Sequence, residues 1–139
     1  MSEIRIFTLD EAERTLPLLR RIIDDLRNEY GVWQAAIARY ELLASASRAE
    51  ETEALVQART AVDHAANRIN DYLVEIREIG CLFKGFDEGL VDFYALREDR
   101  LVFLCWKHGE DQIVHWHEVG AGFPGRQPID ANHFSPILP

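Results

Sequence analysis

Two segments of the chain repeat their apolar residues every seven positions, and this pattern constrains the fold more than any other feature. The first segment runs from Leu9 to Ala44 and the second from Leu55 to Ile79. In each segment a second apolar series follows the first by three positions. Such a heptad repeat is typical of the contact line between two α-helices that coil around each other. The sequence therefore predicts a pair of long helices.

Capping signals mark the ends of these two helices. Thr8 and Glu11 fit a capping box before the first helix, and Ser47 and Glu50 fit another before the second. Gly80 follows the last heptad residue, where glycine commonly ends a helix. Because the connection between the helices is short, they are expected to be antiparallel neighbours in a helical hairpin.

Pro17 interrupts the first helix. Proline lacks an N–H group and clashes with the carbonyl four residues earlier, so a kink or break is expected near Leu16. The heptads continue beyond it, and we expect one long helix to about Ala44. Further apolar residues flank the heptad positions and need another surface to cover them: Leu18, Ile22, Val32, Leu43, Val56, Leu73 and Val74. A sheet or a second copy of the hairpin would provide that surface.

After Gly80 the apolar period shortens to two. Residues 90–96, 101–107 and 112–119 read as strands, and turns near Glu98-Asp99 and Gly109-Glu110 predict a three-stranded antiparallel meander. Residues 3–7 are a candidate additional strand at the N-terminus. If both turns are tight, Asp92 lies opposite Cys105, Cys105 lies opposite Val114, and His115 and His117 lie on the other face.

The predicted fold is therefore α+β in a single domain over residues 1–139. A long antiparallel helical hairpin (8–79) packs on the β-meander (80–119), and an extended tail rich in glycine and proline (120–139) follows.

The charge of the chain excludes some classes of partner, and its hydropathy indicates its location. A net charge of −9 at pH 7 argues against binding to nucleic acid and against docking on an anionic membrane. No apolar run approaches the roughly 20 residues of a membrane-spanning helix, and the first residues lack the core of a signal peptide. We therefore expect a cytoplasmic protein in which Cys81 and Cys105 are reduced thiols.

The residues suited to chemistry cluster between Gly80 and Pro128. The candidates for binding a ligand are Lys84, Asp92, Glu110, His117, Glu118 and Arg126. The candidates for a metal site are Cys105, His115, His117 and Glu118, with Cys81 or Asp92 as further donors. On a strand the two imidazoles would lie on one face about 7 Å apart, a spacing that two ligands of one metal can share. We expect no cofactor, and the alternative is one divalent transition metal such as zinc.

Two further interpretations concern Cys105 and Asp92. Cys105 and His117 could form a cysteine–histidine nucleophile, with Asp92 or Glu118 to orient the imidazole. A cysteine within a central strand is more often an unreactive small apolar residue. Asp92 needs a partner if it is buried, and Arg126 or Lys84 would supply one. That ion pair would either fasten the tail to the sheet or belong to a pocket for a small anion.

Several short motifs together resemble one family. They are Gly80-Cys81, Lys84, Gly89-Leu90-Val91-Asp92-Phe93, Leu104-Cys105-Trp106, Gly109-Glu110, Trp116-His117-Glu118 and Gly125-Arg126-Gln127-Pro128, with Phe7 to Ala12 and Leu16 to Leu19 near the N-terminus. The family is the bacterial domain of unknown function 2203. The resemblance implies a bacterial, soluble, single-domain protein and brings no activity, substrate or cofactor. His115 falls outside the family's pattern, whereas Asp92, Cys105, Glu110, His117, Glu118 and Arg126 fall within it.

The sequence favours a non-enzymatic protein that works by association, with its hairpin forming a homodimer or docking on a partner helix. The alternative is a site on the sheet that binds a ligand or a metal, with or without catalysis. That site would comprise Asp92, Cys105, His117, Glu118 and Arg126. Whether the protein is an enzyme is left open by these patterns.

Overall fold

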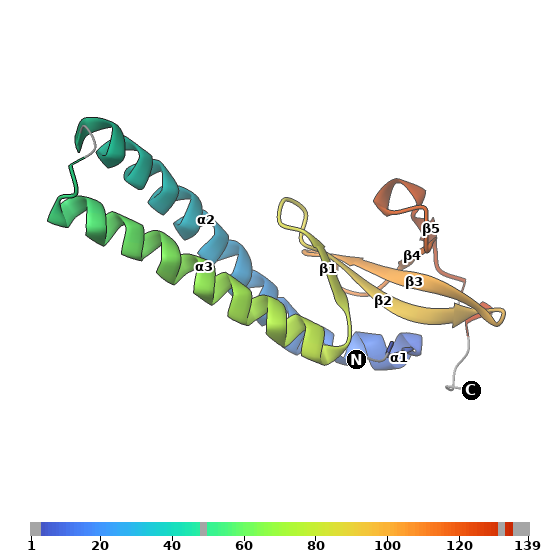
Figure 1. The fold of residues 1–139 in the computed structure, drawn as a ribbon. Coiled ribbons are helices and arrows are strands. Elements are labelled where there is room, and N and C mark those ends of the chain that lie inside the picture. Colours follow the sequence, from blue (N-terminus) through green and yellow to red (C-terminus); the bar gives the residue numbers. More distant parts are fainter. Residues whose placement is uncertain (1–3, 48–49, 131–132, 135–139) are drawn as a thin grey trace. The chain divides into compact units, whose positions relative to one another are not determined.

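The computed structural model describes residues 4–47, 50–130 and 133–134 (Figure 1). Its elements are α1 (Leu9–Arg14), α2 (Leu16–Ser47), α3 (Glu53–Ile79), β1 (Leu82–Gly85), β2 (Leu90–Arg97), β3 (Arg100–Lys107), β4 (His115–Glu118), the 3-10 helix η1 (Phe123–Gly125) and β5 (Gln127–Pro128). Helices precede strands along the chain, which confirms the α+β class. No helix within the described residues is both long and apolar enough to cross a membrane.

The chain forms two compact units. One comprises Asp24–Val74, and the other comprises the residues up to Ile23 together with those from Glu75 onward. The first unit is purely helical, whereas the second holds the sheet, α1 and the adjoining ends of α2 and α3.

The start of the helical region follows the capping signals. The Thr8 hydroxyl accepts a hydrogen bond from the Glu11 N–H at 3.0 Å, and the Glu11 carboxylate accepts one from the Thr8 N–H at 2.9 Å. The expected break is confirmed, because α1 ends at Arg14 and α2 begins at Leu16. One long helix from Leu9 is therefore corrected to two. Pro17 lies in the first turn of α2, where its missing N–H group leaves no hydrogen bond unmade.

The unit Asp24–Val74 is a hairpin of the α2 and α3 segments. Its buried heptad residues are Leu26, Leu55, Ala58 and Ala65. Arg68 on α3 pairs with the largely buried Glu29 on α2, with 2.8 Å between Nε and Oε1. The predicted capping box at Ser47 and Glu50 is wrong, because Ser47 is still helical in α2. Thr52 caps α3 instead, and its hydroxyl accepts from the Leu55 N–H at 3.1 Å.

The sheet has five antiparallel strands in the order β1-β2-β3-β4-β5, which corrects the predicted three. The two additional strands are short edge strands, and β5 consists of Gln127 and Pro128 only. Proline is tolerated at a sheet edge, but a proline in the sequence argues against a strand, so β5 was not predicted. Of the predicted N-terminal strand, residue 3 lies outside the described residues and residues 4–7 form no strand. Phe7 nevertheless donates its N–H to the Tyr94 carbonyl at 2.7 Å.

The turn between β2 and β3 is tight, as predicted. Glu98 and Asp99 both have positive φ, 52° and 64°, which is the backbone form of a two-residue hairpin turn. This turn sets the register of β2 on β3, and Asp92 lies opposite Cys105 as expected.

The connection between β3 and β4 is not tight, and the predicted register there is wrong by one residue. Residues 108–114 form a wider loop, and Cys105 lies opposite His115 rather than Val114. Because side chains alternate along a strand, this shift moves all of β4 to the other face. His117 therefore lies on the same face as Asp92 and Cys105, and Trp116 lies on the opposite face.

That opposite face is the apolar face of the sheet. Its buried residues are Val91, Phe93, Ala95, Val102, Leu104, Trp106 and Trp116. Phe7 from the N-terminal segment packs edge-on against Phe93, with 5.1 Å between ring centroids. Glu13 of α1 accepts a hydrogen bond from the Ile113 N–H at 3.2 Å. Residues from the N-terminal segment thus contact both the apolar face and the β3–β4 loop.

Candidate functional site

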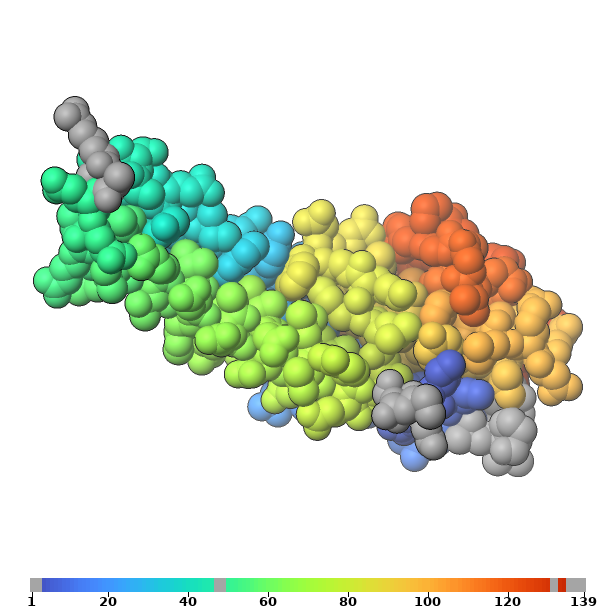
Figure 2. Space-filling model, viewed as in Figure 1, coloured from blue at the N-terminus to red at the C-terminus, as the bar shows by residue number. Residues whose placement is uncertain are grey.

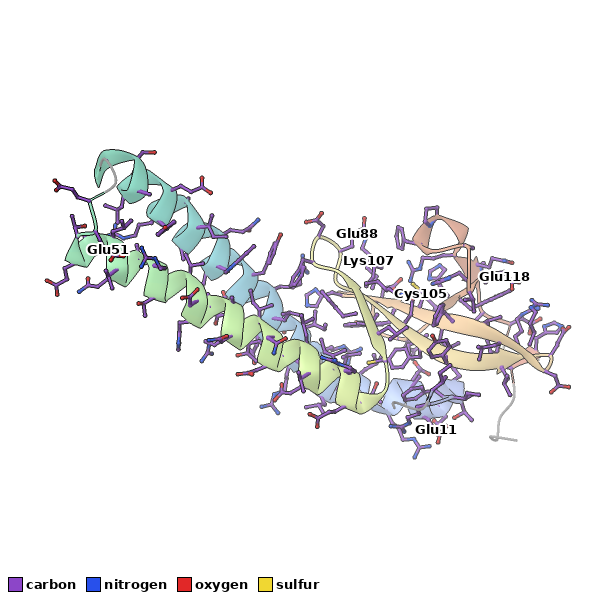
Figure 3. All side chains as sticks on the ribbon, in the orientation of Figure 1. Glu11, Glu51, Glu88, Cys105, Lys107 and Glu118 are labelled. Carbon is purple, nitrogen blue, oxygen red and sulfur yellow. The ribbon has the colours of Figure 1, made fainter. Side chains whose placement is uncertain are left out.

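Three polar side chains meet on the face of the sheet opposite the apolar core. Asp92 comes from β2, Cys105 from β3 and His117 from β4. Their carboxylate oxygen, sulfur and ring nitrogen all lie within 4.8 Å of one another, and all three residues are buried. Figure 3 shows Cys105 within the sheet. Tight pairing of the three central strands therefore brings together residues from three separate motifs.

Both ring nitrogens of His117 have a partner. Nδ1 lies 2.8 Å from the backbone carbonyl of Glu118. A carbonyl only accepts hydrogen bonds, so Nδ1 carries a proton. Nε2 lies 3.1 Å from Oδ1 of Asp92. Without a proton both of these atoms are acceptors, so a stable contact requires a proton or a cation between them.

Cys105 is a buried thiol beside this pair. Burial, together with the negative charge of Asp92, raises the pKa of the Cys105 thiol to about 12, although the Arg126 guanidinium acts in the opposite direction. The metal-free side chain is therefore a neutral thiol near pH 7. A coordinated metal ion would displace this proton and hold the thiolate.

The same geometry argues against a cysteine–histidine nucleophile. A catalytic histidine must take the thiol proton on a free ring nitrogen. In His117 Nδ1 donates to a carbonyl and Nε2 faces Asp92. A reactive cysteine also has a lowered pKa, whereas the pKa of Cys105 is raised to about 12. The three side chains are better suited to sharing a cation than to transferring a proton.

A cavity of about 280 Å³ adjoins the three side chains. The rest of its lining is Lys84, Leu90, Phe103, Val119, Gly122 and Phe123. Figure 2 shows the segment that follows β4, in red-orange, against the strands in yellow and orange. Gly122 has a φ of 67°, a conformation that favours glycine, as this segment turns into η1. The polar face thus borders a small chamber.

Glu110, His115 and Arg126 form a second cluster. The Arg126 guanidinium donates to the Glu110 carboxylate at 2.7 Å and to the Cys105 carbonyl at 3.1 Å. His115 Nδ1 lies 3.5 Å from the other Glu110 oxygen, without hydrogen-bond geometry. The expected ion pair of Asp92 with Arg126 or Lys84 is not found among the described residues, because Asp92 pairs with His117 and Arg126 pairs with Glu110 of the β3–β4 loop. Arg126 therefore holds the backbone of Cys105, and its guanidinium also acts on the thiol, where it lowers the pKa.

The remaining candidates lie apart from the three side chains. Glu118 faces away from them and forms a partly exposed bidentate ion pair with Arg100, at 2.7 and 3.2 Å. Cys81 is buried elsewhere, where its thiol donates to the Ile76 carbonyl at 3.6 Å. Lys84 does line the cavity, but it makes no ion pair among the described residues.

Sequence reasoning missed the walls of the cavity. Leu90 and Phe103 alternate normally within strands and give no sign of a site. Gly122 and Phe123 lie in a turn-rich segment read as an extended tail, where Gly122, Pro124 and Gly125 indicate a turn but no site. The decisive omission was the β4 register, because it separated His117 from Asp92 and Cys105.

Comparison with known proteins bears on the family alone. The family model described as Uncharacterized conserved protein (DUF2203) matches residues 5–129. This match confirms the resemblance carried by the motifs, and it includes every residue of the site and of the cavity lining. No match was found among curated proteins or among solved structures.

Proposed function

The chain belongs to the DUF2203 family of uncharacterized conserved proteins, and we propose that it is a zinc-binding protein with Asp92, Cys105 and His117 as the ligands. The observation that carries this proposal is the His117 ring, which donates through Nδ1 to a carbonyl and directs Nε2 at a carboxylate 3.1 Å away. Histidines that bind metals usually have their second nitrogen fixed in this way.

The donor types and their spacing support zinc. Zinc prefers thiolate, imidazole and carboxylate donors, and tetrahedral bonding places such donor atoms roughly 3.3–3.6 Å apart. The three donor atoms here lie within 4.8 Å of one another. Contraction by about 1 Å, within reach of small side-chain rotations, would complete the coordination. The soft thiolate favours zinc over magnesium or calcium.

The surroundings of the three ligands support a site with one open position. Three protein ligands beside a cavity are typical of zinc sites that accept an exogenous fourth ligand. The Glu118 carbonyl holds the imidazole, and Arg126 holds the backbone of Cys105. These second contacts would keep the ligands oriented before a metal binds. The reduced thiol that zinc requires also fits the expected cytoplasmic location.

Zinc content of the full-length untagged protein tests this proposal. We expect close to one equivalent after exposure to zinc and dialysis, and less than about a tenth in the variants Cys105→Ser and His117→Gln. Cys81→Ala is the matched control, because it removes a buried thiol away from the site and should leave the zinc content unchanged. Circular dichroism checks that each variant is folded. Wild-type protein without bound zinc would refute the proposal.

A second candidate function is association through the unit Asp24–Val74, as a homodimer or on a partner helix. Its support is the exposure of three large apolar side chains there, Val32 at 49%, Leu42 at 71% and Val56 at 42%. Ile37, Tyr40 and Val62 also line a groove on this unit. Exposed apolar side chains of this size favour interaction surfaces when they gather in a patch. This function requires no chemistry at the sheet.

Sedimentation velocity over a range of protein concentrations tests the association. We expect a dimer at tens of micromolar that the variant Val32→Glu converts to a monomer, because a buried unpaired charge opposes association. Asp63→Glu, a conservative change on the same unit, should leave the mass unchanged. A wild-type monomer throughout the range would argue against the homodimer.

A further inference from the structure

The cavity beside Asp92, Cys105 and His117 has a lining that selects a class of ligand. We propose that zinc at this site takes as its fourth ligand the carboxylate of a small apolar organic acid, which Lys84 holds by its charge. This inference rests on the proposed zinc site. Its separate support comes from the position of Lys84, the charge of the site and the apolar walls.

Lys84 is the only lysine or arginine in the lining that the structure describes. Its ammonium group lies 5.6 Å from the centre of the Phe103 ring, another part of that lining. Along β1, Phe83 lies opposite Val91 and Gly85 lies opposite Leu90, so Lys84 is an additional residue in the pairing. Bulges of this kind at sheet edges redirect a side chain and are common beside functional sites.

The charges of the occupied site favour a ligand with one negative charge. A zinc ion bound by one thiolate, one carboxylate and one neutral imidazole has no net charge. Lys84 adds one positive charge to the lining, and the Lys107 ammonium lies 5.9 Å from the ring of Phe123. Asp92 is the only acidic residue in the described lining, and zinc would neutralise it. An anion is therefore favoured over a neutral or cationic ligand.

The walls and the volume limit the rest of the ligand. Four of the nine lining residues have large apolar side chains: Leu90, Phe103, Val119 and Phe123. Its volume of about 280 Å³ lies near the lower end of ligand pockets, which typically hold roughly 300–1,000 Å³. A short aliphatic acid offers one oxygen to the metal, its charge to Lys84 and an apolar body to the walls. Inorganic phosphate has no apolar body and fits less well.

Cobalt-loaded full-length protein provides the test, because the visible absorption of cobalt changes when its ligands change. Isobutyrate is the probe, isobutyramide is its uncharged match, and inorganic phosphate is the competing anion. We expect isobutyrate to change the cobalt spectrum saturably and the amide to leave it unchanged. Phosphate should bind at least about tenfold more weakly, and metal-free protein should show no heat of isobutyrate binding by calorimetry.

The variant Lys84→Gln separates the lysine from the metal. We expect its affinity for isobutyrate to fall about fivefold to tenfold, because it loses one partly screened ion pair, while cobalt stoichiometry stays unchanged. Arg14→Gln is the matched control, because it also removes one positive charge, from an exposed ion pair with Asp10 on α1. It should bind isobutyrate as the wild type does.

The outcomes separate the two proposals. One equivalent of cobalt with no spectral response to isobutyrate would overturn the carboxylate ligand and leave the metal site standing. Equal binding of the acid and the amide, or equal affinity of Lys84→Gln and wild type, would overturn the role of charge. Failure to bind cobalt or zinc at all would overturn the metal site and this inference together.

Discussion

Both faces of the sheet have buried side chains at their centre, but only one of them buries polar groups. On the apolar face Phe93 and Leu104 are fully buried. On the polar face Asp92 and His117 are only 4% and 2% exposed. Apolar burial stabilises a fold by about 25 cal/mol for each Å² removed from water. Burial of a polar group instead costs about 1–3 kcal/mol unless a partner satisfies it.

This difference shows where to look for function. The contribution of the apolar face to stability is sufficient reason for its residues to be buried. The polar face does not, because a buried pair such as His117 and Asp92 often stabilises a protein no more than apolar residues of the same size would. Two polar side chains and a thiol at the centre of a sheet therefore favour a binding role over a structural one.

Neighbouring residues on β2 sharpen this comparison most directly. Phe93→Ala should lower the free energy of unfolding by about 4 kcal/mol, because it leaves a cavity on the apolar face. Asp92→Asn should lower it by at most about 2 kcal/mol, yet weaken zinc binding by more than about a hundredfold. Urea denaturation and zinc competition with a chelator measure the two quantities. The opposite pattern would break the distinction between the faces.

The pH dependence of zinc binding tests whether the polar side chains act as metal ligands. Zinc should displace one proton from the Cys105 thiol, because burial and the charge of Asp92 raise its pKa to about 12. About one proton is then released per zinc, and the apparent affinity rises about tenfold per pH unit near pH 7. Calorimetry in buffers of different ionisation enthalpy measures the release. No proton release would contradict coordination by the thiolate.

Stability at alkaline pH reports on the buried thiols. Burial raises the pKa of both Cys81 and Cys105 from 9.0 to about 12, with Asp92 adding to the effect at Cys105. A raised pKa in the folded state means that this contribution is fully present below pH 9 and is lost as the pH rises toward 12.

Metal-free wild-type protein should therefore lose about 1 kcal/mol or more per pH unit above pH 9. The double variant Cys81→Ala/Cys105→Ala should show a shallower loss, measured by urea denaturation at pH 8 to 11. Equal slopes for the two proteins would show that the thiols do not titrate as buried groups.

The smallest effect is expected at the ion pair between Glu110 and Arg126, next to the three proposed ligands. Glu110→Gln removes the charge that holds Arg126, and we expect a loss of about 1–2 kcal/mol because the pair is only partly exposed. Zinc affinity should fall by no more than about tenfold, because Glu110 and Arg126 are not themselves ligands and act on the site only through Cys105. Unchanged stability would mean that the pair of Glu110 and Arg126 does not contribute to holding the tail.

Local signals predicted much of the fold. The heptads placed α2 and α3, the capping box placed α1, and the tight turn at Glu98-Asp99 set the register of β2 on β3. These features depend on residues close together in the sequence. The edge strands β1 and β5 were missed because they are too short to show a period of two, and β1 is also bulged at Lys84.

The sequence by itself determined that this chain forms a helical hairpin and an antiparallel sheet, and its motifs determined the family. Only the tertiary structure decided on which face His117 lies. The β3–β4 loop is held by Glu13, which accepts from Ile113, and by Arg126, which holds Glu110. Neither contact is visible as a local pattern. Since a shift of one residue moves a strand's side chains to the other face, these distant contacts place His117 beside Asp92 and Cys105.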